Sequence, residues 1–395
     1  MKVALVHELL TMKGGAERVL KVFADMFPDA PIYTLLHDDA AVGDWFPRER
    51  IRHSTLHKWS VLSTNHHLFL SHMSAAVEAW DFSEFDLVIS SSSAFVHGII
   101  TNGNPKHLCY VHSPARYLWD RTHDVLEQAG RGPFGFLRRK YLSYVFHKLR
   151  IWDAESAARP DQLLAASKEV QRRIELYWRR ESVVLHPPID TAWFVPQAGT
   201  PASDTKNYYL IVSTLAPYKR IEIAIEACNK LGTRLLIAGS GRAEHKLRSI
   251  AGPTVEFLGF QNDAQLRTLY SEARAVIFPG EEDFGLVPLE SQACGTPVIA
   301  QKTGGALETI IEGRTGEFFI EPNAESLLKI MQKFDPTKYS SDECRKNAER
   351  FSRKEFEKKI RGYIEKMQLV KSVEGSIGTG GEVSGDALPM ANFSL

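Results

Sequence analysis

Short apolar runs alternate with helix-like segments through the first half of the chain. Helices are expected over residues 14–27, where apolar side chains recur at helical spacing, and over 167–178, with Ser167 as the N-cap. The strand-like runs of this half are residues 2–8, 85–92, 107–113, 161–167 and 182–190. Strands that alternate with helices predict a parallel sheet covered by helices on both faces.

The same alternation restarts after a polar stretch, residues 197–206, that is rich in Gly, Pro, Ser and Thr. Helices are expected at residues 220–231 and 264–273. The strand-like runs of this half are residues 208–214, 233–241, 254–260, 275–280 and 297–301. The pattern predicts a second α/β domain facing the first across a cleft, and ligands of such sheets bind beyond the carboxyl ends of the strands.

A chain of 395 residues is too long for one ordinary core, so two domains are expected. The predicted segments are a first Rossmann-like domain (1–196), a linker (197–206), a second Rossmann-like domain (207–351), a helix (352–371) and a Gly/Ser-rich tail (372–395). The composition of the tail predicts disorder.

Composition excludes several classes of protein. Lys and Arg together number 48, as do Asp and Glu, and without a basic excess we do not expect binding to nucleic-acid phosphates. The four Cys form no C-x-x-C pair, which excludes the usual zinc and redox spacings and fits a reducing compartment. His7 and Glu8 interrupt the apolar start, and no run of 18 apolar residues occurs. A soluble, cytoplasmic protein is expected.

Two carboxylates flank a Phe-Gly-Leu turn within residues 281–300. Glu282 follows a predicted strand, and Glu290 lies about two turns into a helix expected to begin near Phe284. The first N–H groups of a helix form an anion site, and carboxylates accept hydrogen bonds from vicinal hydroxyls. From spacing alone, two solvated surface acids are an equally good interpretation.

Other candidate residues lie where strands meet loops or helices. Lys219 and Arg220 precede a helix and suit a diphosphate, and Gly241 belongs to a glycine turn after the next strand. Gly14 and Gly15 form a similar turn in the first domain, and His112 closes one of its strands. No D-x-D motif stands at a strand end, so the cations and the helix N-terminus would supply the electrostatic role of a metal.

In combination these motifs resemble the retaining GT-B glycosyltransferases of glycosyltransferase family 4. The likeness rests on Glu282-x7-Glu290, Lys219 and residues 303–316, and with residues 14–36 and 186–190 it extends to about Lys371. Residues 110–120 and 216–232 look like the bacterial O-antigen and exopolysaccharide mannosyltransferases that use GDP-mannose. The resemblance implies a sugar-nucleotide donor, no further cofactor, and a final helix that crosses back to the first domain.

The resemblance also implies residue roles in the second domain. Glu290 would hold the nucleotide ribose and Glu282 the hydroxyls of the transferred sugar. Lys219 would neutralise the leaving diphosphate. The backbone N–H groups that would bind sugar and phosphate belong to Phe284, Gly285 and Leu286.

Further implications concern His112 and one departure from the family pattern. His112 would lie beside the sugar near its anomeric carbon. The family usually has Arg where this chain has Thr214, and Arg220 is the candidate to supply the missing charge. The family implies retention of configuration, by front-face attack in which the leaving phosphate accepts the proton of the acceptor.

Other functions stay open at this point. A GT-B sugar-nucleotide epimerase would share the carboxylates. A non-catalytic nucleotide-sugar-binding subunit would bind the donor without turnover. A glycoside hydrolase also uses paired carboxylates, but the phosphate-binding features would then have no purpose. For the acceptor, residues 133–152 mix cations with aromatic residues. They would either lie on a membrane surface near a polyprenyl-diphosphate-linked saccharide or form an amphipathic helix packed on the first domain.

Overall fold

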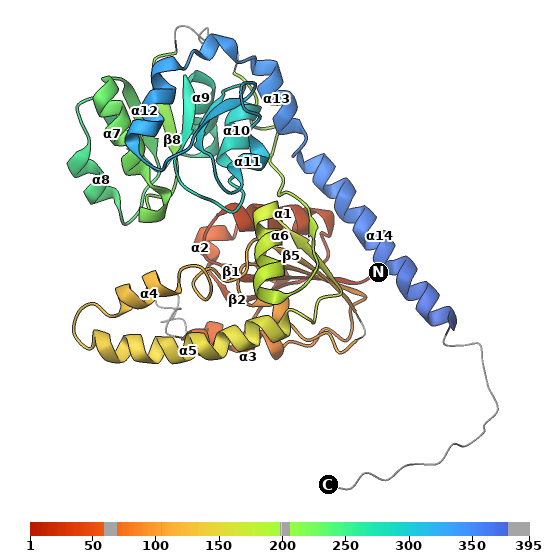
Figure 1. The fold of residues 1–395 in the computed structure, drawn as a ribbon. Coiled ribbons are helices and arrows are strands. Elements are labelled where there is room, and N and C mark those ends of the chain that lie inside the picture. The colour runs from red at the N-terminus through yellow and green to blue at the C-terminus, as the bar shows by residue number, and fades with distance from the viewer. Residues whose placement is uncertain (59–68, 104, 198, 200–205, 378–395) are drawn as a thin grey trace, which may run out of the picture. The chain divides into compact units, whose positions relative to one another are not determined.

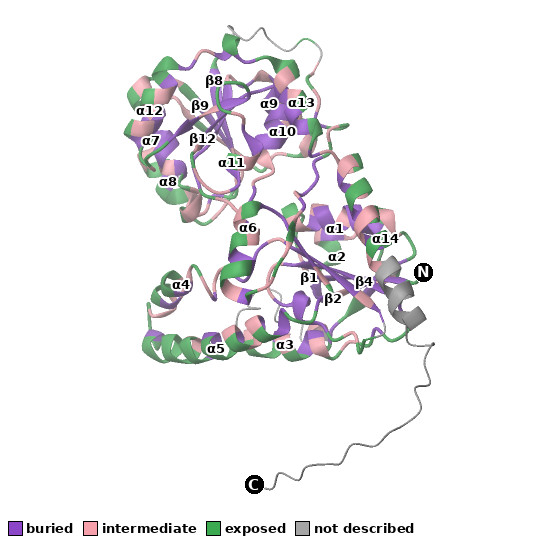
Figure 2. Ribbon diagram, turned by 45° about the vertical axis from the view of Figure 1, so that its right-hand side comes forward, coloured by how far each residue is buried: buried purple, intermediate pink, exposed green. Residues whose placement is uncertain are grey.

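The computed structural model describes residues 1–58, 69–103, 105–197, 199 and 206–377, of which 1–357 pack as one compact unit (Figure 1). This unit contains two parallel sheets, each covered by helices, and the strands of both are mostly buried (Figure 2). The predicted fold class, two Rossmann-like α/β domains, is confirmed.

The first sheet has seven strands in the order β3-β2-β1-β4-β5-β6-β7, all parallel. Its strands are β1 (Val3–Leu10), β2 (Ile32–His37), β3 (Ile51–His53), β4 (Leu87–Ser92), β5 (Lys106–Val111), β6 (Gln162–Ala165) and β7 (Val183–Val184). Its helices are α1 (Gly15–Met26), α2 (Asp39–Val42), α3 (Leu70–Glu78), α4 (Thr122–Ala129), α5 (Gly135–Ser156) and α6 (Lys168–Arg173), which continues as a π-helical turn over Ile174–Trp178. Ser167 caps α6 as predicted, because its Oγ accepts a hydrogen bond from the Val170 N–H at 3.1 Å.

The second sheet has six parallel strands in the order β10-β9-β8-β11-β12-β13. Its strands are β8 (Tyr208–Val212), β9 (Arg234–Ala238), β10 (Val255–Gly259), β11 (Ala275–Phe278), β12 (Val298–Gln301) and β13 (Gly316–Phe319). The helices after β8 are α7 (Ile221–Leu231), α8 (Glu244–Ile250), α9 (Asp263–Glu272), α10 (Val287–Ala293), α11 (Ala306–Thr309), α12 (Ala324–Lys333), α13 (Ser341–Glu349) and α14 (Arg353–Ile377).

The chain enters the core of the second domain earlier than its predicted start. Ile189 and Phe194 are buried in one cluster with Tyr208 and Leu210 of β8. Packing therefore places the change of domain just after the Pro187–Pro188 pair and not at residue 196. Within the predicted linker, residues 198 and 200–205 lie outside the described residues.

Helix α14 is longer than the helix predicted over 352–371. It continues to Ile377, since no proline interrupts it, so residues 372–377 are helical and not part of a disordered tail. Residues 378–395 of that tail lie outside the described residues. At its start Arg353 Nη1 lies 2.9 Å from Asp25 Oδ2, so the chain returns here to α1 of the first domain. No helix in the described ranges is long and apolar enough to cross a membrane.

Candidate functional site

A cavity of about 680 Å³ is lined by loops from both domains. Its walls come from the start of α1, the end of β5 and the loops after β8, β9 and β11, so it lies at the carboxyl ends of strands as α/β folds lead us to expect. The predicted site residues that line it are Gly14, Gly15, His112, Thr214, Lys219, Glu282, Phe284, Gly285, Leu286 and Glu290. Its volume is that of a small-molecule or nucleotide site.

Two predicted residues are not among the described residues that line this cavity. Arg220, with φ 53°, lines a neighbouring cavity together with Glu222 and Arg242. For Gly241, a Cβ would lie 2.4 Å from the Leu215 carbonyl oxygen, so close packing of two loops requires this glycine. In its turn, Gly239 is the glycine that lines the cavity.

Glu290 is 7% exposed, so its interpretation as a surface acid is wrong. Its helix, α10, begins at Val287 and not near Phe284, because Gly285 is in the left-handed region (φ 83°) and Pro288 occupies the first turn. Glu290 Oε2 accepts a hydrogen bond from the Tyr270 hydroxyl at 2.8 Å. Burial raises the pKa of Glu290, although Arg18 and the Tyr270 hydrogen bond oppose the shift.

Lys219 and Glu282 contact each other directly. The Lys219 Nζ forms an ion pair with Glu282 Oε1, and both side chains are partly buried at the cavity wall. Lys219, the predicted partner of the diphosphate, and Glu282, the predicted partner of the sugar hydroxyls, therefore lie at the same place in the cavity.

His112 belongs to a buried hydrogen-bonded chain. Ser91 Oγ lies 2.8 Å from His112 Nε2 and 3.1 Å from His7 Nδ1. Burial and the neighbouring His7 lower the pKa of His112 to about 4, so its ring is neutral at pH 7. Burial opposes protonation of His7 as well, but the hydrogen bond and charge of Glu17 raise the pKa of His7 above its usual value.

Glu17 continues this chain to the glycine turn. Its Oε1 lies 3.4 Å from His7 Nε2, and its Oε2 accepts a hydrogen bond from the Gly14 N–H at 2.9 Å. A Cβ on Gly14 would lie 2.6 Å from the same Oε2. The roles of His7, Ser91 and Glu17 were not predicted from the sequence, although His7 and Ser91 are polar residues inside the buried strands β1 and β4.

Arginines of the first domain hold the loop that carries Glu282. Arg173, at the end of α6, is 3% exposed and forms an ion pair with Asp283. Arg116 Nη1 lies 3.5 Å from the same Asp283 Oδ1, and Arg18 Nη2 lies 2.7 Å from Asp263 Oδ1. No local spacing in the sequence reveals these pairs, because their partners are far apart along the chain.

Metal ligands do not gather in the described part of the chain. No group of three or more His, Cys, Asp or Glu side chains could hold an ion there. The cations that line the cavity instead include Lys13, Arg18, Arg116, Arg121 and Lys219.

Residues 197–351 match the family model described as "Glycosyl transferases group 1". This segment is therefore similar to group 1 glycosyltransferase domains. It contains Thr214, Lys219, Glu282 and Glu290, and so contributes the charged wall of the cavity.

Curated relatives that are similar to part of the chain are also glycosyltransferases. The chain is 34% identical over 179 residues to the D-inositol 3-phosphate glycosyltransferase of Mycolicibacterium smegmatis, covering 40% of this chain and 41% of that protein. It is 35% identical over 134 residues to an uncharacterized glycosyltransferase of Methanocaldococcus jannaschii, covering 31% of this chain and 34% of that protein. The chain thus spans between a third and about two fifths of the length of these relatives.

Solved structures share the fold over most of the chain. HepE from Anabaena, in complex with UDP-glucose, has a TM-score of 0.66 and 17% identity, covering 93% of this chain and 100% of that chain. At this identity the likeness shows the fold, which is the GT-B arrangement of two Rossmann-like domains.

Proposed function

We propose that the protein is a glycosyltransferase that takes its sugar from a nucleoside diphosphate sugar. The observation that carries the proposal is the single cavity that brings Lys219, Glu282 and Glu290 of the group 1 domain together with His112 and the glycine turn of the first domain. A sugar nucleotide has the matching groups in one molecule: a diol-bearing ribose, a diphosphate and a sugar.

Each part of the donor has a partner of suitable chemistry. Glu290 would accept hydrogen bonds from the ribose hydroxyls, and Phe260, 81% exposed where it lines the cavity, offers a ring on which a nucleobase can stack. Lys219 and the backbone N–H groups of residues 284–286 would bind the diphosphate. Glu282 would bind the sugar hydroxyls, and neutral His112 would hydrogen-bond to the sugar without protonating it.

The proposed reaction retains the anomeric configuration. The bond from the anomeric carbon to the phosphate oxygen breaks, with Lys219 stabilising the charge that develops on the diphosphate. The acceptor hydroxyl attacks from the same face, its oxygen bonds to the anomeric carbon, and its proton passes to the departing phosphate. No metal takes part in this route.

For the donor and acceptor we propose mannose from GDP-mannose and a polyprenyl-diphosphate-linked saccharide in bacterial surface polysaccharide synthesis. The support is the resemblance of residues 110–120 and 216–232 to the bacterial mannosyltransferases. UDP-glucose, the ligand of the HepE structure, is the competing donor to test.

Calorimetric titration with GDP, UDP and ADP, followed by their sugar conjugates, tests the donor. The protein is then incubated with its preferred donor in the presence of EDTA, once without and once with a lipid-linked saccharide. Nucleotide release that needs the acceptor supports a transferase, and an epimerised donor without acceptor would instead indicate an epimerase. Tight binding without any product would indicate a binding subunit.

A further inference from the structure

Helix α5 presents an apolar face that the other described residues leave uncovered. Phe134, at its N-cap, is 82% exposed, and Phe136 and Tyr144 are 74% and 62% exposed. The exposed large apolar residues along this helix are Phe136, Leu137, Tyr141, Tyr144 and Ile151. At 100° per residue they share one side of the helix, opposite the side that buries Val145, Phe146 and Leu149. Exposed apolar surface of this extent marks an interaction site.

The Lys and Arg side chains of residues 128–152 give this segment positive charge only. Residues 128–152 contain the six cations Arg131, Arg138, Arg139, Lys140, Lys148 and Arg150 and no acidic residue, in a chain with zero net charge. Lys140 and Lys148 fall on the same side of α5 as the exposed aromatic rings. Interleaved Lys and aromatic residues on one helix face fit the boundary between lipid headgroups and acyl chains.

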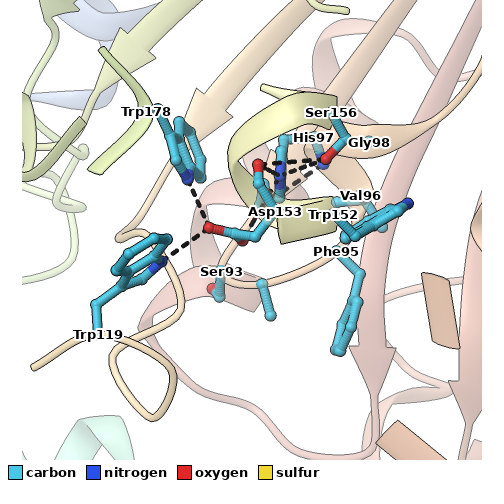
Figure 3. Close-up of polar contacts among 12 residues, drawn as sticks. Ser93, Phe95, Val96, His97, Gly98, Trp119, Trp152, Asp153, Ser156 and Trp178 are labelled. Atoms are coloured by element: carbon cyan, nitrogen blue, oxygen red, sulfur yellow. Dashed lines mark hydrogen bonds and ion pairs between the residues drawn. The ribbon is translucent and has the colours of Figure 1, made fainter. Parts of the chain in front are cut away.

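The other end of α5 is held firmly in the first domain. Asp153 is fully buried, and its Oδ2 accepts hydrogen bonds from the indole N–H groups of Trp119 at 2.9 Å and Trp178 at 2.7 Å (Figure 3). The His97 ring stacks on Trp178 and lies within 3.1 Å of Ser156 Oγ. The exposed half of α5 is therefore a continuous extension of an anchored helix.

The turn between α4 and α5 is also fixed. Arg138 donates hydrogen bonds from Nε to the Ala129 carbonyl at 2.7 Å and from Nη2 to the Arg131 carbonyl at 2.8 Å. Figure 2 shows the end of α5 beside α4 as exposed. Arg138 thus closes the hairpin, whereas Lys140 and Lys148 leave their charges on the outer face.

We propose that this outer face of α5 docks on an anionic lipid bilayer. The aromatic rings would enter the headgroup boundary, and the two lysines would pair with lipid phosphates. A second copy of this chain is disfavoured as the occupant, since a two-fold contact would bring lysines together with no acidic residue between them. The proposal goes beyond sugar transfer and does not depend on it, although it would bring a lipid-linked acceptor to the protein.

Co-sedimentation of the full chain with phosphatidylcholine vesicles, with and without phosphatidylglycerol, tests this surface. Lys140→Gln with Lys148→Gln should reduce binding to anionic vesicles about thirtyfold, from about fivefold for each charge lost near the surface. Phe136→Gln with Tyr144→Gln should reduce it at least about tenfold, because Gln keeps the helix but not the apolar area. Lys230→Gln with Ile320→Gln, exposed positions in the second domain, is the matched control and should bind as the parent protein does.

Calorimetric nucleotide binding by each variant shows that it is folded and that its donor site is intact. Equal binding to neutral and anionic vesicles, or unchanged binding by both α5 variants, would overturn the proposal. So would concentration-dependent dimerisation that Phe136→Gln abolishes, which would assign the face to a second copy. Vesicle binding without sugar transfer would leave this proposal standing and would count against the proposed function alone.

Discussion

The two walls of the cavity are built from different chemistry. The second-domain wall carries charge, with Lys219 paired to Glu282 and Glu290 buried beside Tyr270. The first-domain wall offers a glycine turn and a neutral His112, both held from behind by the chain through Ser91, His7 and Glu17. Its charged residues at the cavity are cations: Lys13, Arg18, Arg116 and Arg121. The charged wall of the second domain should therefore govern donor affinity and the leaving group, and His112 of the first-domain wall should govern orientation of the sugar.

The largest effect should come from the charged wall. Lys219→Ala should lower kcat/KM about a hundredfold, because removing a group that stabilises developing charge typically costs that much or more. Steady-state kinetics with the preferred donor measure the loss, and Lys219→Arg should recover part of it. Activity within about twofold of the parent would remove Lys219 from the reaction.

The two carboxylates of the charged wall should differ in what they affect. Glu290→Gln should weaken nucleotide binding, whereas Glu282→Gln should mainly lower kcat, because we propose that only Glu282 contacts the moving sugar. Each lost charged hydrogen bond is worth roughly 1.5–3 kcal/mol, or about tenfold or more. Calorimetry with the free nucleoside diphosphate separates the two, since it lacks the sugar; equal losses in both variants would contradict the assignment.

The difference between the two walls also explains why one part of the site could be predicted from the sequence and another could not. The charged wall and the strands leading to it were predictable, because the spacing of Glu282 and Glu290 and the βα alternation are local patterns. The ion pair between Arg173 and Asp283 could not be predicted, since it joins residues that are 110 positions apart in the chain. The role of Gly241 could not be predicted either, because it depends on how closely Gly241 approaches the Leu215 carbonyl oxygen in the folded protein. Strands β2, β3 and β13 and most helices outside the motifs were also not assigned from the sequence.

The neutral ring of His112 in the first-domain wall makes a prediction about pH. The pKa of His112 is lowered from 6.5 to about 4, so between these values the unfolded chain binds a proton that the folded chain does not. This contribution to stability is complete above about pH 6.5 and is lost as the pH falls toward 4. Histidine-ring NMR should show His112 signals, assigned with His112→Gln, that do not shift between about pH 6 and 8. Titration near neutral pH would show that the ring is not neutral.

The smallest effect should come from Arg220, which the sequence suggested as a substitute for the cation missing at position 214. Thr214 is exposed and lines the same cavity as Lys219, so Thr214→Arg should tighten nucleoside diphosphate binding about tenfold through a new charged contact. Arg220 lines the neighbouring cavity, so Arg220→Ala should change that affinity less than about twofold. The effects should then be additive in a double-mutant cycle, because the two side chains share no ligand group. A strong loss from Arg220→Ala that Thr214→Arg repairs would mean that Arg220 reaches the diphosphate, and that the charged wall extends beyond the cavity that Lys219 lines.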